Sequence, residues 1–274
     1  MYPNFSNTNL AKAIAYCIAA VLIFSLYNTF YVEIAVYWNR QMETDIITRD
    51  IKSIINFENI WLINYSLFFV AALSLLNMQF IKSVRLGKIV LLLIGIAVLF
   101  FLTKGLYTFS ELREYYLIKP SGNIFNIIIR YISFLFVAFA MFAGYIFAYK
   151  NIVSLSVRRL VEVFLHISIL WILSSELIHW LDIAGFRDNY RMGLSILWGM
   201  YALVFIVLGI WKKKKVLRFE AIFLFGITLL KLIVYDVSNL DTISKTIVFV
   251  LLGVLLLVIS FLYNKYKNKI FEAD

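Results

Sequence analysis

The sequence has few charged residues, few residues that interrupt helices and almost no cysteine. Only 15% of its 274 residues are charged, whereas 63% are hydrophobic, and the mean hydropathy is +0.88. A soluble globular chain usually carries about 25% charged and about 45–50% apolar residues. Two prolines and eleven glycines leave long stretches in which a helix need not end. This composition excludes an ordinary soluble domain and indicates a membrane protein.

The scarcity of cysteine and histidine excludes several chemistries. Cys17 is the only cysteine, so no internal disulfide can form. The two histidines, His166 and His179, are 13 residues apart, about 20 Å along one helix, and therefore cannot bind one haem iron. The sequence has no His-Glu-x-x-His zinc motif, no glycine-rich phosphate loop and no Gly-x-Ser-x-Gly elbow. We therefore expect no metal and no cofactor.

Eight apolar windows reach the length of about 20 residues that a membrane-spanning helix needs. They lie near residues 10–31, 60–80, 89–109, 125–149, 160–181, 194–211, 219–235 and 243–263. Strands of a membrane barrel would be about ten residues long and would alternate apolar with polar residues. We therefore predict an all-α polytopic transmembrane helix bundle of about eight spans, forming a single domain over residues 1–274.

Basic residues between the windows predict the orientation. With eight spans, four basic clusters fall on one side of the membrane: Lys82, Arg85 and Lys88; Lys150, Arg158 and Arg159; Lys212 to Lys215 with Arg218; and Lys265, Lys267 and Lys269. Cytoplasmic loops carry such an excess, so both termini should be cytoplasmic. The net charge of +10 resides in these loops, and for that reason we expect no nucleic-acid partner.

Two further patterns predict packing. In the first outer loop, isoleucines 47, 51, 54 and 55 recur at helical spacing, which predicts a helix that lies on the outer surface or covers the mouth of a cavity. In the fourth window, Ala140, Gly144 and Ala148 form a ladder of small residues. Such a ladder lets another helix approach closely, and we expect it to pack inside the bundle.

The fifth window contains four ionisable side chains, including both histidines of the sequence. Glu162, His166 and Glu176 lie in one helical stripe, with His179 beside it. An ionisable group there costs at least about 2.5–3.5 kcal/mol, so it indicates a functional site unless packing explains it. We assign Glu162 and His166 to packing, because they lie near the inner face. Glu176 and His179 lie near the outer end and are candidate site residues.

Other polar residues occur at the same outer level. Lys104, Arg130, Lys231, Tyr235 and Asp236 are predicted to line an outward-facing polar cavity around Glu176 and His179. In the alternative interpretation, Lys104 and Arg130, together with Lys245, only reach to the interface with their long side chains. Lys231 lies too deep for that, and we predict that its amine is within direct or one-water reach of Glu176.

The last quarter of the chain carries a recognisable series of residues. Trp198-x-x-Tyr201 is followed by Leu230-Lys231, Tyr235-Asp236, Leu240-Asp241 and Ser260-x-x-Tyr263. This series resembles the C-terminal spans of the bacterial predicted membrane proteins grouped as domain of unknown function 2339. Members of that family are usually longer, and Ser244-Lys245 stands where an aromatic–arginine pair is expected. The resemblance implies a multi-span fold, points again to Lys231 and Asp236, and implies no activity.

These observations favour a transporter or ligand-binding component of the bacterial cytoplasmic membrane, with an outward-facing polar cavity. One alternative is a membrane enzyme of envelope assembly that uses Glu176 or His179 as general base on a lipid-linked substrate. Another is a structural subunit of a membrane complex. The expected partners are the lipid bilayer, other membrane proteins, and anionic lipid bound at Lys212, Lys213, Lys214 and Lys215.

Overall fold

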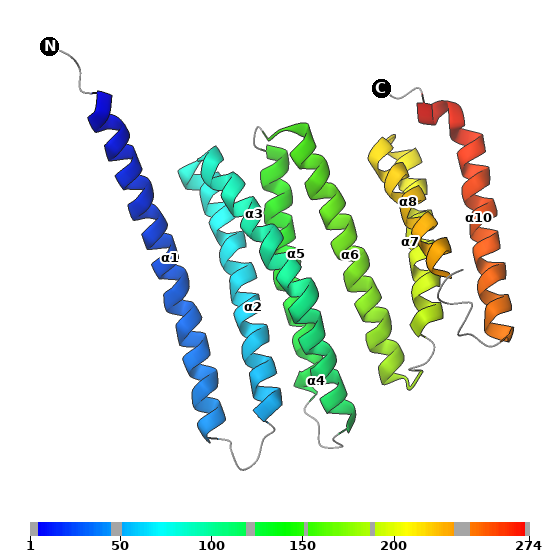
Figure 1. Ribbon diagram of the computed structural model, residues 1–274, viewed down its shortest axis with the longest axis horizontal. Coiled ribbons are helices and arrows are strands. Elements are labelled where there is room, and N and C mark those ends of the chain that lie inside the picture. The colour runs from blue at the N-terminus through cyan, green and yellow to red at the C-terminus, as the bar shows by residue number, and fades with distance from the viewer. Residues whose placement is uncertain are drawn as a thin grey trace. The chain divides into compact units, whose positions relative to one another are not determined.

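The chain folds into helices, most of which are longer than the apolar windows that predict them. The computed structural model describes residues 5–44, 51–118, 124–150, 153–186, 190–232 and 242–271. Every regular element within these ranges is a helix (Figure 1). The prediction of an all-α fold is therefore confirmed.

The chain divides into two compact units, Met1–Ile152 and Val153–Asp274. Unit 1 contains α1 (Phe5–Thr44), α2 (Ile51–Leu76), α3 (Val84–Phe100), α4 (Leu106–Ile118) and α5 (Phe125–Lys150). Unit 2 contains α6 (Leu155–Ile183), α7 (Tyr190–Trp211), α8 (Lys215–Lys231) and α10 (Thr242–Phe271). The single domain over residues 1–274 stays a prediction.

Within the described ranges, six helical segments are long and apolar enough to cross a membrane. They are Ala13–Glu43, Ile51–Ile81, Val84–Ile118, Phe125–Lys150, Leu155–Ile183 and Tyr190–Trp211. The predicted spans 219–235 and 243–263 correspond to α8 and α10, and residues 233–241 between these helices lie outside the described residues. The count of eight spans is not confirmed and stays a prediction.

The predicted surface helix in the first outer loop is wrong. Helix α1 continues to Thr44 and α2 begins at Ile51, so Ile54 and Ile55 belong to the first turns of α2, while Ile47 lies outside the described residues. No glycine or proline interrupts the sequence between residues 32 and 44, and the helix therefore continues past its apolar window. Its 40 residues measure about 60 Å, roughly twice the thickness of the hydrocarbon core.

The small-residue ladder on α5 lies in the core of unit 1, as its pattern predicts. Ala140 and Ala148 are fully buried. A Cβ built on Gly144 would meet Ile94 and Leu91 of α3 at 3.5 Å, which is ordinary van der Waals contact. The ladder therefore packs α5 against α3 within this unit.

A buried amide organises the turn between α2 and α3. The last residues of α2 continue into a π-helical segment, Asn77–Ile81, after which Lys82 takes a left-handed conformation with φ of 54°. The Asn77 Nδ2 donates to the Ser83 carbonyl (3.0 Å), and the Ser83 amide donates to Asn77 Oδ1 (3.1 Å). The Ser83 hydroxyl then accepts from the Leu86 amide and caps α3.

Candidate functional site

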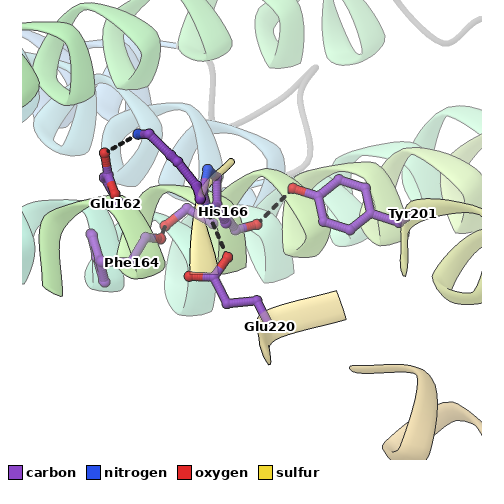
Figure 2. Close-up of polar contacts among 7 residues, drawn as sticks. Glu162, Phe164, His166, Tyr201 and Glu220 are labelled. Carbon is purple, nitrogen blue, oxygen red and sulfur yellow. Dashed lines mark hydrogen bonds and ion pairs between the residues drawn. The ribbon is translucent and has the colours of Figure 1, made fainter. Parts of the chain in front are cut away.

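A group of polar contacts joins three helices of unit 2. We define the His–Glu cluster as Glu162 and His166 of α6, Tyr201 of α7, Glu220 of α8 and Lys214 of the turn between α7 and α8 (Figure 2). These five residues come from four segments of the chain, so the cluster forms only when the three helices pack together.

The turn between α7 and α8 brings Lys214 and Glu220 into place. Lys213 adopts φ of 54°, its amide donates to the Ile210 carbonyl (3.2 Å), and the Lys214 amide donates to the Gly209 carbonyl (3.0 Å). This pair of bonds is a Schellman motif, which ends a helix and reverses the chain within three residues. Helix α8 therefore starts beside the end of α7.

Gly209 permits the close approach of the two helices in this hairpin. A Cβ at this position would lie 2.7 Å from Arg218 Cγ and 3.0 Å from the Arg218 backbone nitrogen. A methyl group would therefore push α8 away from α7. Because Glu220 is only two residues beyond Arg218, the glycine also determines where that carboxylate lies.

The central contact of the cluster joins a histidine to a carboxylate. His166 Nδ1 lies 2.7 Å from Glu220 Oε2, and the two side chains are 22% and 17% exposed. The Phe205 ring meets the imidazole edge-on at a centroid distance of 4.7 Å. The second carboxylate oxygen, Glu220 Oε1, is buried and has no hydrogen-bond partner among the described residues. The pair can hold one proton in more than one arrangement.

The remaining members of the cluster hold α6 in register with the hairpin. The Tyr201 hydroxyl donates to the His166 carbonyl (3.0 Å), so α7 is attached to the same residue that contacts α8. One turn earlier on α6, Glu162 accepts a hydrogen bond from the Lys214 ammonium at 2.7 Å. Figure 2 shows Glu162, His166, Tyr201 and Glu220 gathered around one stretch of helix.

Further polar contacts continue along the same interface. The Trp198 indole donates to the Ser174 hydroxyl (2.9 Å). Beyond it, the Lys231 ammonium donates to the Ser195 hydroxyl (2.7 Å) and to the Arg191 carbonyl (3.2 Å). Ser195, Trp198 and Tyr201 are spaced by three residues and therefore lie along one face of α7. Hydrogen bonds between side chains and neighbouring helices therefore occur at several levels along α6, α7 and α8.

The predicted site residues are distributed over both units. Unit 2 contains Glu176 and His179 on α6 and Lys231 at the end of α8, and His179 is only 1% exposed. Tyr235 and Asp236 lie outside the described residues. The pairing of Lys231 with Glu176 stays a prediction; the described contacts of the amine are those with Ser195 and Arg191.

The two cations from unit 1 have different environments. The Lys104 side chain is exposed in a π-helical segment, Phe101–Gly105, with its ammonium 5.7 Å from the centre of the Tyr107 ring. Arg130 is only 1% exposed, and its guanidinium carbon lies 5.7 Å from the Phe109 ring centre and 5.4 Å from that of Phe134. Arg130 is therefore enclosed by protein, and the interpretation that it reaches to the interface is wrong.

Sequence reasoning missed Glu220 and gave too little weight to His166. Glu220 stands at the edge of an apolar window, where a charged side chain can reach the headgroups at little cost, so its presence there gives no signal by itself. A usable signal is that three residues share one predicted depth in the membrane. Glu162, His166 and Glu220 each lie within about two helical turns of the predicted cytoplasmic end of their window. Groups at one depth on neighbouring helices are candidates for mutual contact.

The larger of the two cavities described in unit 1 is apolar. It has a volume of about 680 Å³ and lies among α1, α2 and α3. Its few polar groups include the Tyr27 and Ser66 hydroxyls, which are 2.9 Å apart and bonded to each other. Among the described residues, no group of three or more His, Cys, Asp or Glu side chains is placed to hold a metal ion.

The fold defines an integral membrane protein with several membrane-spanning helices, in contact with the lipid bilayer. Over residues 4–266 the chain matches the family described as "Predicted membrane protein (DUF2339)", and it belongs to that family. The match extends far beyond the last quarter of the chain in which the resemblance was recognised. No curated protein and no solved structure matches the chain significantly.

Proposed function

We propose that this protein is a transporter component of the bacterial cytoplasmic membrane in which His166 and Glu220 bind and release a proton. The observation that carries the proposal is the 2.7 Å contact between His166 Nδ1 and Glu220 Oε2 across α6 and α8, next to a buried carboxylate oxygen that has no hydrogen-bond partner among the described residues. A scaffold would be expected to satisfy both oxygens, because an unsatisfied buried acceptor costs about 1–3 kcal/mol.

Protonation of this pair alters the attachment of α6 to the hairpin of α7 and α8. A charged imidazole and a carboxylate form an ion pair, whereas a neutral imidazole and a carboxylate form only a hydrogen bond, which is weaker. Tyr201 and Lys214 attach the same part of α6 to the hairpin. A proton that arrives or leaves therefore changes helix packing, which is the coupling a proton-linked transporter requires.

The proposed orientation places the turn between α7 and α8 at the cytoplasmic leaflet. Lys214 is engaged with Glu162, whereas Lys212 and Lys213 are exposed. We propose that these two ammonium groups contact anionic lipid headgroups, each worth about 1 kcal/mol near a charged surface. Such contacts would hold the hairpin of α7 and α8 at the membrane surface while α6 moves relative to it.

The proposal is tested by distance measurement. In a Cys17→Ser background, which has no other cysteine, spin labels at Leu160→Cys of α6 and Phe219→Cys of α8 report the separation of these helices in liposomes. Both positions are well exposed, so the labels replace little packing. We expect the distance distribution to change between pH 5 and pH 8, and the change to disappear in His166→Gln and Glu220→Gln. Glu43→Gln, at an exposed position of unit 1, is the control and should retain it.

Transport is tested in the same liposomes with an internal pH-sensitive dye. Mixtures of amino acids, dicarboxylates and hexoses are added separately, and one mixture should move protons with the wild type but not with Glu220→Gln. If the distance distribution of the wild type does not change with pH, the proposal that His166 and Glu220 bind and release a proton is contradicted. A pH response without proton movement for any mixture would contradict transport.

A membrane enzyme is the second candidate. With Nδ1 against Glu220, the His166 ring is oriented by a carboxylate and its Nε2 can act as general base. Glu220→Gln would then lower turnover of a lipid-linked substrate, and no solute mixture would move protons. A structural role predicts a third result, in which both variants lower stability and change neither readout.

A further inference from the structure

A second cavity of unit 1 combines one carboxylate with aromatic rings. It has a volume of about 500 Å³, lies between α1 and α2, and is lined by Phe30, Glu33, Ile34, Tyr37, Trp38 and Trp61. We propose that this cavity binds the ammonium headgroup of a membrane lipid. The proposal concerns residues remote in sequence from the His–Glu cluster and does not depend on the function proposed for unit 2.

The carboxylate supplies the negative charge. The Glu33 side chain is exposed, and within the described residues it forms no ion pair and no hydrogen bond. Its charge is therefore available to a cation from outside the chain. An exposed carboxylate surrounded only by water would not indicate a binding site. Here aromatic rings form the other walls of the cavity.

Two rings of the cavity stand perpendicular to each other. The centroids of Tyr37 and Trp38 are 5.5 Å apart with their planes at 85°. Trp38 is held in place because Phe57 stacks on it at 5.8 Å and 11°. Ring faces attract an alkylammonium group within about 6 Å, and perpendicular rings offer it more than one face. A nearby carboxylate adds a charge-assisted contact that a primary or quaternary ammonium can use.

The location favours a lipid over a free amine. Tyrosine and tryptophan collect where the acyl chains end and the headgroups begin, and the rings of this cavity lie at the end of the apolar run of α1. Val32 and Val36, on the same stretch of α1, are 47% and 36% exposed. A lipid whose headgroup enters the cavity can therefore extend its chains along α1. An aromatic belt alone explains the rings, but it does not explain a carboxylate among them that has no partner in the described part of the chain.

Native mass spectrometry of the full chain in detergent tests the proposal, with phosphatidylethanolamine and phosphatidylglycerol of equal chain length as probes. We expect about a tenfold preference of the wild type for phosphatidylethanolamine, equivalent to about 1.4 kcal/mol. Glu33→Gln and Trp38→Leu should each reduce the preference to less than about threefold. Glu43→Gln, at an exposed position of the same helix outside the cavity, should leave it unchanged.

Circular dichroism should show equal helix content in all variants, so that a lost preference reflects the cavity. Equal binding of the two lipids by the wild type would overturn the proposal, and so would a full preference in Glu33→Gln. Competition by tetramethylammonium or ethanolamine without any preference between the lipids would assign the cavity to free amines and overturn its assignment to lipid.

Discussion

Replacing Gly209 by alanine should separate α8 from α7 and disturb the His–Glu cluster. The added methyl would lie 2.7 Å from Arg218 Cγ, 3.0 Å from the Arg218 backbone nitrogen and 3.2 Å from Leu217 Cβ. Arg218 is only 4% exposed, and a backbone atom cannot move without moving α8. Overpacking of this kind typically costs about 1–3 kcal/mol.

Gly226→Ala, in the same hairpin, provides a matched control. A Cβ at Gly226 meets nothing within 4 Å. Both substitutions gain about 1 kcal/mol of helix propensity, so this term cancels when the two variants are compared. The free energy of unfolding of Gly209→Ala should therefore be about 1–3 kcal/mol below that of Gly226→Ala. Denaturation by sodium dodecyl sulfate in mixed micelles, followed by circular dichroism, measures the difference.

The same pair of variants connects packing to the site. Since Glu220 follows Arg218 by two residues, a displaced α8 should move the carboxylate from His166, and Gly209→Ala should weaken the pH response of the labelled helices. Gly226→Ala should retain it. Unfolding free energies that agree within about 0.5 kcal/mol would refute the close approach at Gly209, since they would leave no room for a steric cost.

Three further predictions follow from the turns and the topology. Lys213→Gly should stabilise the protein by up to about 1 kcal/mol, because glycine adopts the φ of 54° without strain, whereas Lys212→Gly should not; denaturant titration measures both. Gly87→Ala should lower the unfolding midpoint relative to Gly95→Ala, because a Cβ at Gly87 overlaps the buried Phe147 ring and one at Gly95 meets nothing. Reporter fusions should read cytoplasmic after Lys88, Arg159, Lys215 and Lys269, and external near Asp50, Gly122 and Asn239; an external result at Lys215 would contradict eight spans.

The sequence predicts the helical class well because hydropathy over 20 residues is a strong signal. It predicts helix ends poorly, since a helix does not end where the apolar side chains end. Between residues 32 and 44 nothing breaks the backbone, and α1 continues through that stretch. The isoleucine pattern that suggested a surface helix includes the buried face of the first turns of α2, where Ile54 is 4% exposed. The helical spacing of the isoleucines alone does not distinguish a surface helix from the first turns of a longer helix.

The candidate site is harder to predict because it depends on which helices are neighbours. The stripe of ionisable residues on α6 was identifiable from the sequence, but the partners of its members were not. His166 contacts Glu220, 54 residues away, and Glu162 contacts Lys214, 52 residues away. The reversal that permits both contacts depends on a left-handed lysine at position 213, a conformation that no sequence rule assigns to lysine.

Three of the residues that carry the family resemblance have a shared physical role in unit 2. Trp198, Tyr201 and Lys231 each donate a hydrogen bond to a neighbouring helix, to Ser174, to the His166 carbonyl and to Ser195 respectively. Each is a long side chain with a polar tip, which suits a helix interface in lipid because the tip must find an acceptor within the protein. This part of the pattern therefore contributes to the packing of α6, α7 and α8.

Glu220 is not part of that pattern, although it completes the His–Glu cluster. Its Oε2 contacts His166, yet its Oε1 remains buried without a partner among the described residues. The Glu220 side chain is only 17% exposed, and a carboxylate removed from water loses hydration that a leucine would not need. The contacts of Trp198, Tyr201 and Lys231 are hydrogen bonds between packed helices. Glu220 adds an ionisable contact to the same interface, and that contact is the basis of the proposed proton binding.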